Sequence, residues 1–390
     1  MRVAHVITRL IVGGAQENTI ATVLALREAP DVTVELVAGP TTGPEGSLAA
    51  QVAGVPGLLT MLPSLVRPVH PWHDLGALAA LTRHFRDTRP DLVHTHSGKA
   101  GVLGRLAARR AAVPVIVHSI HGPSFGPFQG MLANGLFRSA ERLAGRATTH
   151  FISVADAMTR QYLAAGIGQP EQYTRIFSGF DLRPFLAATN DAAIRRQLGL
   201  DPDDFVVGMI ARLFKLKGHD DLFAIAPELV RQCPRMKFLF VGDGIWRDRF
   251  QQLARSLDLE RHFFFTGLVP PADVPKYVGV MDALVHLSRR EGLPRALPQA
   301  LAAGRPVIAY DCDGAGEVCF DQKTGFLVAP GDLPTLRDRM LRLASTADLR
   351  QRLGEAGRAF VEQNFAVEKM TQEIYTLYQR LLADQRNATN

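Results

Sequence analysis

Cysteine is scarce in this chain of 390 residues, which contains only Cys233, Cys312 and Cys319. An odd, widely spaced set excludes a disulfide framework, and the spacing does not match that of zinc ligands. We therefore expect three reduced and mostly buried thiols.

Long apolar runs are also missing. None approaches the ~20 residues that a membrane-spanning helix needs. The N-terminus, Met1 to Ile7, enters a strand-like segment directly and lacks a signal-peptide pattern. These absences predict a cytoplasmic protein. A composition of 47% hydrophobic and 21% charged residues is typical of a globular enzyme, and 390 residues exceed one ordinary core, which predicts two domains.

Two further absences exclude function classes. A dehydrogenase of the dinucleotide-binding type needs Gly-x-Gly-x-x-Gly after its first strand, which Gly13-Gly14 does not supply. Residues 1–180 hold 16 Lys and Arg against 11 Asp and Glu, a basic balance that suits nucleic acid or an anionic membrane. Without interleaved aromatics, zinc spacing or a helix-turn-helix pattern, we exclude nucleic acid as a partner.

Apolar strand-like segments alternate with amphipathic helical segments along the chain, beginning with Val3 to Ile7 and a helix that ends near Arg27. This rhythm predicts an α/β fold with parallel sheets, in which ligands bind at the carboxyl ends of the strands. We place the N-terminal domain at residues 1–185 and the C-terminal domain at residues 186–366.

The most informative stretch runs from Ser288 to Gly304. It follows the apolar segment Ala283 to Leu287 and leads into a helix ended by Gly304. A strand that passes through Glu-Gly-Leu-Pro into a helix places the carboxylate of Glu291 beside first-turn amides, which favour an anionic ligand. An ordinary strand-loop-helix connection is the alternative.

Two cations, Arg212 and Lys217, follow the strand-like segment Phe205 to Ile210. An Arg offers a bidentate fork and a Lys a point charge, and together they suit a diphosphate. Solvated surface cations are the alternative interpretation.

These segments resemble the family 4 retaining glycosyltransferases of GT-B fold, whose signature is Glu, seven residues, Glu. Glu291 matches the first acid, and Gln299 stands where the second usually grips the donor ribose. A Gln can still hydrogen-bond ribose hydroxyls, although without charge. The family's Arg, four residues, Lys-Gly pattern is matched by Arg212 and Lys217.

The resemblance implies a two-lobed α/β architecture. Two Rossmann-like domains would face a central cleft, the first binding the acceptor and the second the nucleotide-sugar donor, and the last helix, about 367–385, would pack back on the first. The implied reaction moves a sugar, with retention, from a UDP or GDP type donor to a glycan or lipid-linked acceptor in exopolysaccharide, lipopolysaccharide or glycolipid assembly. No divalent metal and no cofactor are implied.

The resemblance also implies roles for individual residues. The residues implied in catalysis are Glu291, His121, Arg212 and Lys217. Those implied in donor binding are Gly13, Gly14, Arg212, Lys217, Gly242, Leu268, Val269, Glu291, Gly292, Leu293, Pro294 and Gln299. Those implied in acceptor binding are His94, His96, Lys99 and His121.

Histidines gather at predicted strand ends in the first domain. His94 and His96 alternate and so share one face of a strand, but a zinc site would need a third ligand. The basic helix that follows, with Arg105 and Arg109 four apart, could touch a phosphorylated lipid acceptor or the membrane surface, or be a solvated face.

Two alternatives stay open at this point. A nucleotide-sugar epimerase shares the GT-B architecture but needs no acceptor. A non-catalytic protein that binds sugar nucleotides is the other alternative.

Overall fold

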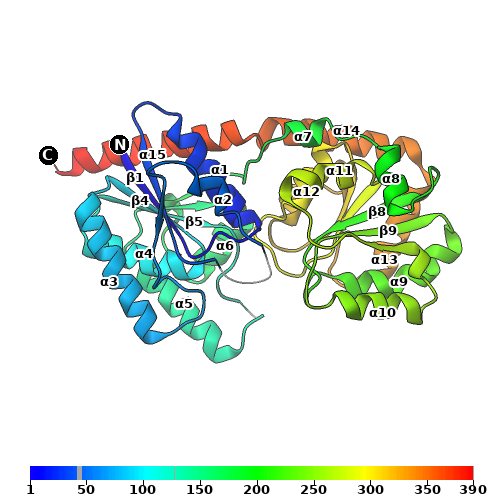
Figure 1. Cartoon of the computed structure of the whole chain (residues 1–390), viewed down its shortest axis with the longest axis horizontal. Coiled ribbons are helices and arrows are strands. Elements are labelled where there is room, and N and C mark those ends of the chain that lie inside the picture. The colour runs from blue at the N-terminus through cyan, green and yellow to red at the C-terminus, as the bar shows by residue number, and fades with distance from the viewer. Residues whose placement is uncertain (42–45, 127, 390) are drawn as a thin grey trace. The chain divides into compact units, whose positions relative to one another are not determined.

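The computed structural model describes residues 1–41, 46–126 and 128–389 (Figure 1). The chain forms two compact units: an N unit of Met1–Phe180 with Val367–Asn390, and a C unit of Asp181–Ala366. The division falls a few residues before residue 185, where sequence analysis places it. The reason is that helix α7 (Arg183–Leu186) packs against α11 and α12 of the C unit.

The N unit is built on a seven-stranded parallel sheet in the order β3-β2-β1-β4-β5-β6-β7. The order reverses between β1 and β4, which makes the carboxyl ends of these two strands the expected ligand-binding edge. The strands are β1 (Arg2–Ile7), β2 (Thr33–Ala38), β3 (Leu59–Met61), β4 (Leu92–His96), β5 (Val115–Ile120), β6 (His150–Ser153) and β7 (Tyr173–Arg175).

Helices cover both faces of this sheet because its strands are apolar on both sides. In β5, Val115 and Val117 pack with α1 and α15, whereas Ile116 between them packs with α3 and α4. The last helix, α15, therefore belongs to the N unit (Figure 1). The helices are α1 (Gly14–Arg27), α2 (Ala50–Ala53), α3 (Pro71–Thr88), α4 (Gly98–Arg110), α5 (Met131–Gly145), α6 (Asp156–Ala164) and α15 (Val367–Thr389), with the 3-10 turn η1 (Pro170–Gln172).

The C unit repeats the plan with six parallel strands in the order β10-β9-β8-β11-β12-β13, so its reversal lies between β8 and β11. The strands are β8 (Phe205–Ile210), β9 (Met236–Val241), β10 (Phe263–Phe265), β11 (Ala283–His286), β12 (Val307–Tyr310) and β13 (Gly325–Val328). Besides α7, the helices are α8 (Ala192–Leu198), α9 (His219–Gln232), α10 (Arg247–Ser256), α11 (Val274–Gly279), α12 (Ala296–Ala302), α13 (Leu333–Ser345) and α14 (Ala347–Asn364), with the 3-10 turns η2 (Glu260–His262), η3 (Pro271–Asp273) and η4 (Asp313–Glu317).

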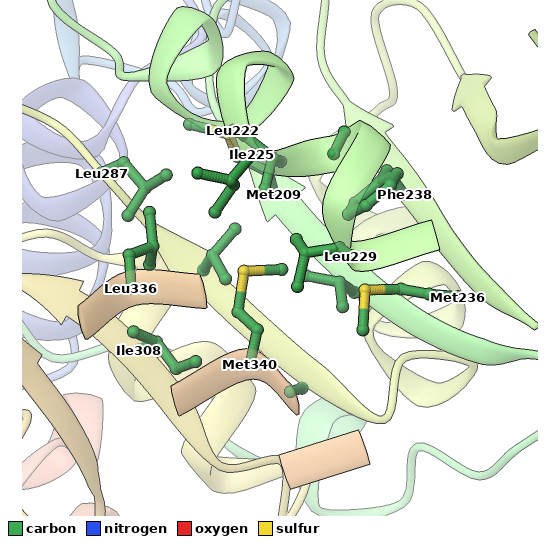
Figure 2. Packing of buried hydrophobic residues seen from close by; sticks show 14 of the residues in the cluster. Met209, Leu222, Ile225, Leu229, Met236, Phe238, Leu287, Ile308, Leu336 and Met340 are labelled. Carbon is green, nitrogen blue, oxygen red and sulfur yellow. The ribbon is translucent and has the colours of Figure 1, made fainter. Parts of the chain in front are cut away.

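A continuous apolar core fixes the strands of the C unit. Leu222, Ile225 and Leu229 recur at helical spacing on α9 and meet Leu336 and Met340 of α13 over the sheet (Figure 2). All five side chains are buried. Side chains of β8 and β11 belong to this core, which positions the loops that leave the carboxyl ends of the two strands.

The cysteines are free thiols, but only Cys319 is fully buried; Cys233 and Cys312 are half-buried. Burial raises the pKa of the Cys312 thiol to about 12, and Asp313 beside it adds to the effect. Across residues 1–41, 46–126 and 128–389, no helix is both long and apolar enough to cross a membrane.

Candidate active site

Two loops meet at the β8/β11 reversal of the C unit. The backbone N–H of Arg289, after β11, donates to the carbonyl oxygen of Leu216, after β8, at 2.8 Å. Gly218 lies so close to Leu287 that a Cβ at this position would be 2.2 Å from the Leu287 carbonyl oxygen, and its φ of 82° also favours glycine. The close approach locks the two loops together.

An ion pair between Lys217 and Glu291 joins the same loops. The Nζ of Lys217 donates to Oε1 of Glu291, and the two side chains are 19% and 23% exposed. The Nε2 of His286 lies 3.6 Å from that carboxylate oxygen. Burial opposes the charge on Glu291, but Lys217 and His286 outweigh it and hold the pKa of the carboxyl well below its usual range. Glu291 is therefore an ionised acceptor of hydrogen bonds.

The backbone of Glu291 is held from a third segment. Its N–H donates to Oδ2 of Asp313 at 2.7 Å, and the N–H of Gly314 donates to the carbonyl oxygen of Gly292 at 3.0 Å. Asp313 has a φ of 52°, a left-handed conformation that is uncommon outside glycine. The turn η4 thus holds the backbone from which the Glu291 side chain projects.

The helix after this loop is α12. Its first residue is Ala296, with Arg295 as the N-cap, so Gly292, Leu293 and Pro294 form a bend ahead of the first turn. Pro294, which the resemblance implies in donor binding, has no N–H and so cannot donate a hydrogen bond from its backbone. Gly292 and Leu293 retain their N–H groups. The predicted end is confirmed, because Gly304 follows the helix with a φ of 67°.

The other donor-site residues of the C unit lie around these loops. Arg212 is exposed in the β8–α9 loop, and Gln299 is half-buried in α12. The N–H of Gly242 donates to the carbonyl oxygen of Gly267 at 3.1 Å, which brings the β9 end beside the segment with Leu268 and Val269. Leu268 is 51% exposed and Val269 is buried. Among the residues of the C unit that the resemblance implies in donor binding, Lys217 and Glu291 are joined by a direct ion pair.

In the N unit, Gly13 is the N-cap of α1 and Gly14 is its first residue. A Cβ at Gly13 would meet only the Gln16 side chain, at 3.0 Å, so no neighbouring segment demands glycine there. The helix N-terminus that follows β1 lies at the β1/β4 reversal.

Buried histidines occupy that reversal. His5 of β1 pairs with His94 of β4 in the sheet register, and His5, His94 and His96 are at most 1% exposed. The Nδ1 of His96 is hydrogen-bonded to Nε2 of half-buried His121 at 3.0 Å. His94 is hydrogen-bonded at both ring nitrogens, to Tyr378 of α15 at 2.5 Å and to Ser119 at 2.8 Å. The burial puts His94 and His96 behind His121 rather than in direct reach of an acceptor.

Burial also decides the charge of these rings. It lowers the pKa of His5 to about 3 and that of His121 to about 4, and it lowers the pKa of His94 and His96 well below the usual value. The rings are therefore neutral imidazoles at physiological pH. His5 supplies the third imidazole that sequence analysis did not find for a metal site, since ring nitrogens of His5, His94 and His96 lie within 4.8 Å of one another.

Two basic residues of the N unit have internal partners. The Nζ of Lys99 donates to Oδ1 of Asp74 and to the carbonyl oxygen of Pro68, which already satisfies the charge expected to face an acceptor. Arg105 is fully buried and pairs with Glu141 of α5 at 2.5 Å. The expectation that Arg105 contributes to an exposed basic face is therefore wrong, because α5 covers that side of α4.

Comparison with known proteins decides the family. The family model for glycosyl transferases group 1 matches residues 190–360, and that for the glycosyl transferase 4-like domain matches residues 13–178. A Mycolicibacterium smegmatis protein named GDP-mannose-dependent alpha-(1-6)-phosphatidylinositol monomannoside mannosyltransferase is 30% identical over 272 residues, 68% of this chain and 69% of the relative. The chain is a family 4-type glycosyltransferase.

Further relatives of this glycosyltransferase agree. An Escherichia coli protein named UDP-Gal:alpha-D-GlcNAc-diphosphoundecaprenol alpha-1,3-galactosyltransferase is 27% identical over 322 residues, covering 81% of this chain and 82% of the relative. The named transferases place the chain in glycan biosynthesis and give no support to the epimerase alternative.

Solved structures show the fold. Anabaena Alr3699/HepE, solved in complex with UDP, superposes with a TM-score of 0.80 at 24% identity, covering 97% of this chain and all of that one. Sucrose-phosphate synthase from Thermosynechococcus elongatus gives a TM-score of 0.80 at 19% identity. The predicted α/β fold, with two Rossmann-like domains of GT-B type, is confirmed.

Several residues at the glycosyltransferase's candidate site were missed by sequence analysis. His286 and Asp313 hold Glu291, and His5 and Tyr378 lie behind His121. The one available signal was the concentration of histidines in the first half, where nine of the 12 occur. Tyr378 gives no signal, because its contacts depend on how α15 packs.

Proposed function

We propose that the C unit binds the diphosphate and sugar of a nucleotide-sugar donor, and that the enzyme transfers this sugar to an acceptor hydroxyl with retention at the anomeric carbon. The observation that carries the proposal is the Lys217–Glu291 ion pair at the β8/β11 reversal. A cation and an ionised carboxylate side by side suit a ligand that presents phosphate next to sugar hydroxyls. The exposed Arg212 on the same loop adds a second cation.

The charges fit a front-face substitution. As the bond from the anomeric carbon to the diphosphate oxygen breaks, negative charge grows on the leaving group, and Lys217 and Arg212 stabilise it more in the transition state than in the ground state. The acceptor oxygen bonds the anomeric carbon on the same face, and its proton passes to the departing phosphate oxygen. Glu291, ionised and paired with Lys217, accepts hydrogen bonds from sugar hydroxyls rather than attacking carbon.

Two protein cations at the diphosphate supply the positive charge that a divalent ion provides in other transferases. We therefore propose that transfer requires no divalent metal and no cofactor. The N–H groups of Gly292 and Leu293 add donors for the diphosphate oxygens.

The donor is a UDP or GDP sugar in this proposal. The names of two relatives mention UDP-Gal and GDP-mannose, and Anabaena Alr3699/HepE was solved with UDP. The exposed Leu268 and its neighbours beside Gly242 are suited to contact the base through backbone groups. In the N unit, Gly13 and Gly14 leave the amino end of α1 open to approach, and half-buried His121 contacts the sugar or the acceptor.

The proposal is tested by assaying transfer from UDP and GDP sugars in EDTA and determining the anomeric configuration of the product by NMR. We expect retention and undiminished turnover without metal. Glu291→Gln should lower kcat/KM by roughly 100-fold, because the neutral amide loses the charge-assisted bonds to the sugar. Glu355→Gln, on an exposed turn of α14, is the matched control. Inversion, or wild-type turnover by Glu291→Gln, would contradict the mechanism.

We also propose that the acceptor is lipid-linked and that the N unit rests on the inner face of the cytoplasmic membrane. Large apolar side chains are exposed at the amino ends of two helices in one layer: Leu132 (91%) and Leu136 (61%) on α5, and Trp72 (75%) on α3. These helix ends follow the carboxyl edge of the sheet, where the candidate site lies. Apolar groups on a unit of positive net charge suit an anionic bilayer.

Co-sedimentation with vesicles tests this surface. Binding to phosphatidylglycerol vesicles should exceed binding to phosphatidylcholine vesicles and should fall in Leu132→Ser/Leu136→Ser. Ile245→Ser, which removes an exposed apolar side chain (76%) from the C unit, should bind as the wild type does. Equal binding by all three proteins would refute the role of α5.

A further inference from the structure

A single row of hydrogen bonds runs from His121 into the core of the N unit. His121 Nε2 meets His96 Nδ1 at 3.0 Å, and His96 Nε2 meets His5 Nδ1 at 2.9 Å. His5 Nε2 then meets Oη of Tyr378 at 3.3 Å. The row continues from Tyr378 to His94 at 2.5 Å and from His94 to Ser119 Oγ at 2.8 Å. We call these six residues the histidine chain.

The protons in this chain cannot be placed independently. Each neutral imidazole has one N–H donor and one lone pair, so a ring that accepts at one nitrogen must donate at the other. The low pKa values of His5, His94, His96 and His121 keep the rings neutral. The donors of His121, His96 and His5, which are linked ring to ring, therefore all point the same way, either toward Tyr378 or away from it.

Tyr378 selects between these directions. A phenol is a strong donor, and O–H donors make shorter bonds than N–H donors do. The Tyr378 contact to His94 is 2.5 Å and that to His5 is 3.3 Å, which assigns the O–H to His94 and makes the His5 Nε2–H a donor to Tyr378. Following the chain outward, His96 donates to His5, and His121 donates from Nε2 to His96.

From this geometry we propose that Tyr378, through His5 and His96, holds His121 as the Nε2–H tautomer and so leaves a lone pair on its Nδ1. Tyr378, His5 and His96 are then positioning residues, and α15 helps to determine what His121 offers a ligand. An Nδ1 lone pair accepts a hydrogen bond, so the ligand group facing it is a hydroxyl, of the sugar or of the acceptor. The catalytic consequence rests on the proposed function of His121, whereas the tautomer does not.

A metal ion is the competing explanation for three clustered imidazoles. It would need ring nitrogens of His5, His94 and His96 as ligands. His5 and His94 use both ring nitrogens in the chain, and so does His96. The hydrogen bonds therefore account for the cluster without an ion, and none of the six residues of the histidine chain offers a carboxylate to a buried divalent charge.

NMR of protein labelled with ¹⁵N-histidine tests the proposal without any substrate, because protonated and lone-pair ring nitrogens resonate far apart. The His121 signals are assigned by their loss in His121→Gln. In the wild type we expect Nε2 protonated and Nδ1 unprotonated. The opposite tautomer, or zinc retained at one equivalent by the purified protein, would overturn the proposal.

Tyr378→Phe removes one oxygen atom and so interrupts the hydrogen bonds of the histidine chain. We expect mixed tautomers at His121 and, in the transfer assay, a roughly tenfold lower kcat with little change in donor KM. Tyr375→Phe, on the same helix, is the control. The Tyr375 hydroxyl donates to the exposed Asp31 at 2.9 Å and accepts from Gln379 at 2.7 Å, and neither partner belongs to the histidine chain, so the change should leave His121 unaltered.

The NMR measurement tests the positioning role of Tyr378, and the transfer assay tests whether the His121 tautomer matters for transfer. A wild-type tautomer in Tyr378→Phe would overturn the positioning role. The predicted tautomers together with wild-type kcat in Tyr378→Phe would overturn the role in transfer while leaving the donor site of the C unit untouched. Should Tyr378→Phe not fold, the tautomer of the wild-type protein alone still decides the direction of the chain.

Discussion

The two units share the strand order of their first six strands but differ in the polar groups at the point where that order reverses. In the C unit the reversal carries charges, Lys217 and Glu291, whose side chains are about one-fifth exposed. In the N unit it carries neutral imidazoles such as His5 and His94, which have no exposed surface. The same topology therefore sets the place of a site in both units, whereas burial and charge decide which ligand each site suits.

The same contrast appears in the ion pairs. Arg105 and Glu141 of the N unit are 0% and 2% exposed, so water and ligands do not reach them. Lys217 and Glu291 remain accessible to a ligand. We infer that the first pair holds α4 to α5 and that the second binds substrate.

Acid should produce the largest difference between the units. Folding lowers the pKa of five histidines in the N unit: His5, to about 3, His121, to about 4, and His94, His96 and His118. At a pH between 6.5 and these lowered pKa values, the histidines are protonated in the unfolded chain and neutral in the folded protein. The unfolding free energy therefore falls as pH drops below 6.5, by up to about 1.4 kcal/mol per pH unit for each histidine.

Urea unfolding at pH 7.5, 6 and 5, with hydrogen exchange to follow each unit, measures this effect. The C unit has a similar group in His219, whose pKa is lowered to about 3 by burial, so it should lose less. His84 acts in the opposite sense, since Glu35 raises its pKa, and offsets a small part of the loss. Equal acid sensitivity of the two units would contradict the account.

Breaking the buried ion pair should be the next largest effect. Arg105→Ala leaves Glu141 charged and buried, which costs about 3–5 kcal/mol of unfolding free energy. Arg105→Met/Glu141→Leu removes both charges and should recover most of that loss. Chemical denaturation of the three proteins measures both values. A double variant as unstable as Arg105→Ala would show that the charges themselves stabilise the N unit.

Removing the partly exposed Lys217 of the C unit should impair transfer instead of folding. Lys217→Ala should lower kcat/KM by an amount equivalent to about 2–4 kcal/mol of transition-state stabilisation, with little change in unfolding free energy. Lys215→Ala, an exposed lysine two residues earlier on the same loop, is the control and should retain wild-type activity. Loss of stability in place of activity would make Lys217 a structural residue.

Gln299 gives the smallest expected effect. A carboxylate accepts stronger hydrogen bonds from hydroxyls than an amide does, by about 1 kcal/mol. Gln299→Glu should therefore lower the donor KM about fivefold. Steady-state kinetics with the preferred donor measures the change, and a raised KM would mean that Gln299 does not face the ribose.

The sequence predicted what depends on local periodicity and motif spacing. The alternation of strands and helices gave the α/β class, and the positions of Arg212, Lys217 and Glu291 placed them on the loops that the structure puts at the β8/β11 reversal. Gly304 ended its helix where expected because a left-handed residue there is a local requirement.

Long-range packing explains the predictions that were wrong and the site residues that were missed. Helical spacing groups Arg105 with Arg109 but does not say that α5 covers one of them. Tyr378 reaches His5 from the far end of the chain, and Asp313 reaches Glu291 from the next strand's loop.

Nucleotide binding would show whether Lys217, Glu291 and Arg212, at the β8/β11 reversal of the C unit, hold a diphosphate. Thermal shifts should be measured with UDP, GDP, ADP and dTDP in EDTA for the wild type, Arg212→Ala and the exposed-surface control Arg231→Ala. We expect UDP or GDP to raise the melting temperature without metal, because a nucleotide at 100 times its dissociation constant adds about 2.7 kcal/mol to the unfolding free energy. Arg231→Ala should keep this shift and Arg212→Ala should lose it. No shift with any nucleotide, or an undiminished shift in Arg212→Ala, would contradict the proposed diphosphate site.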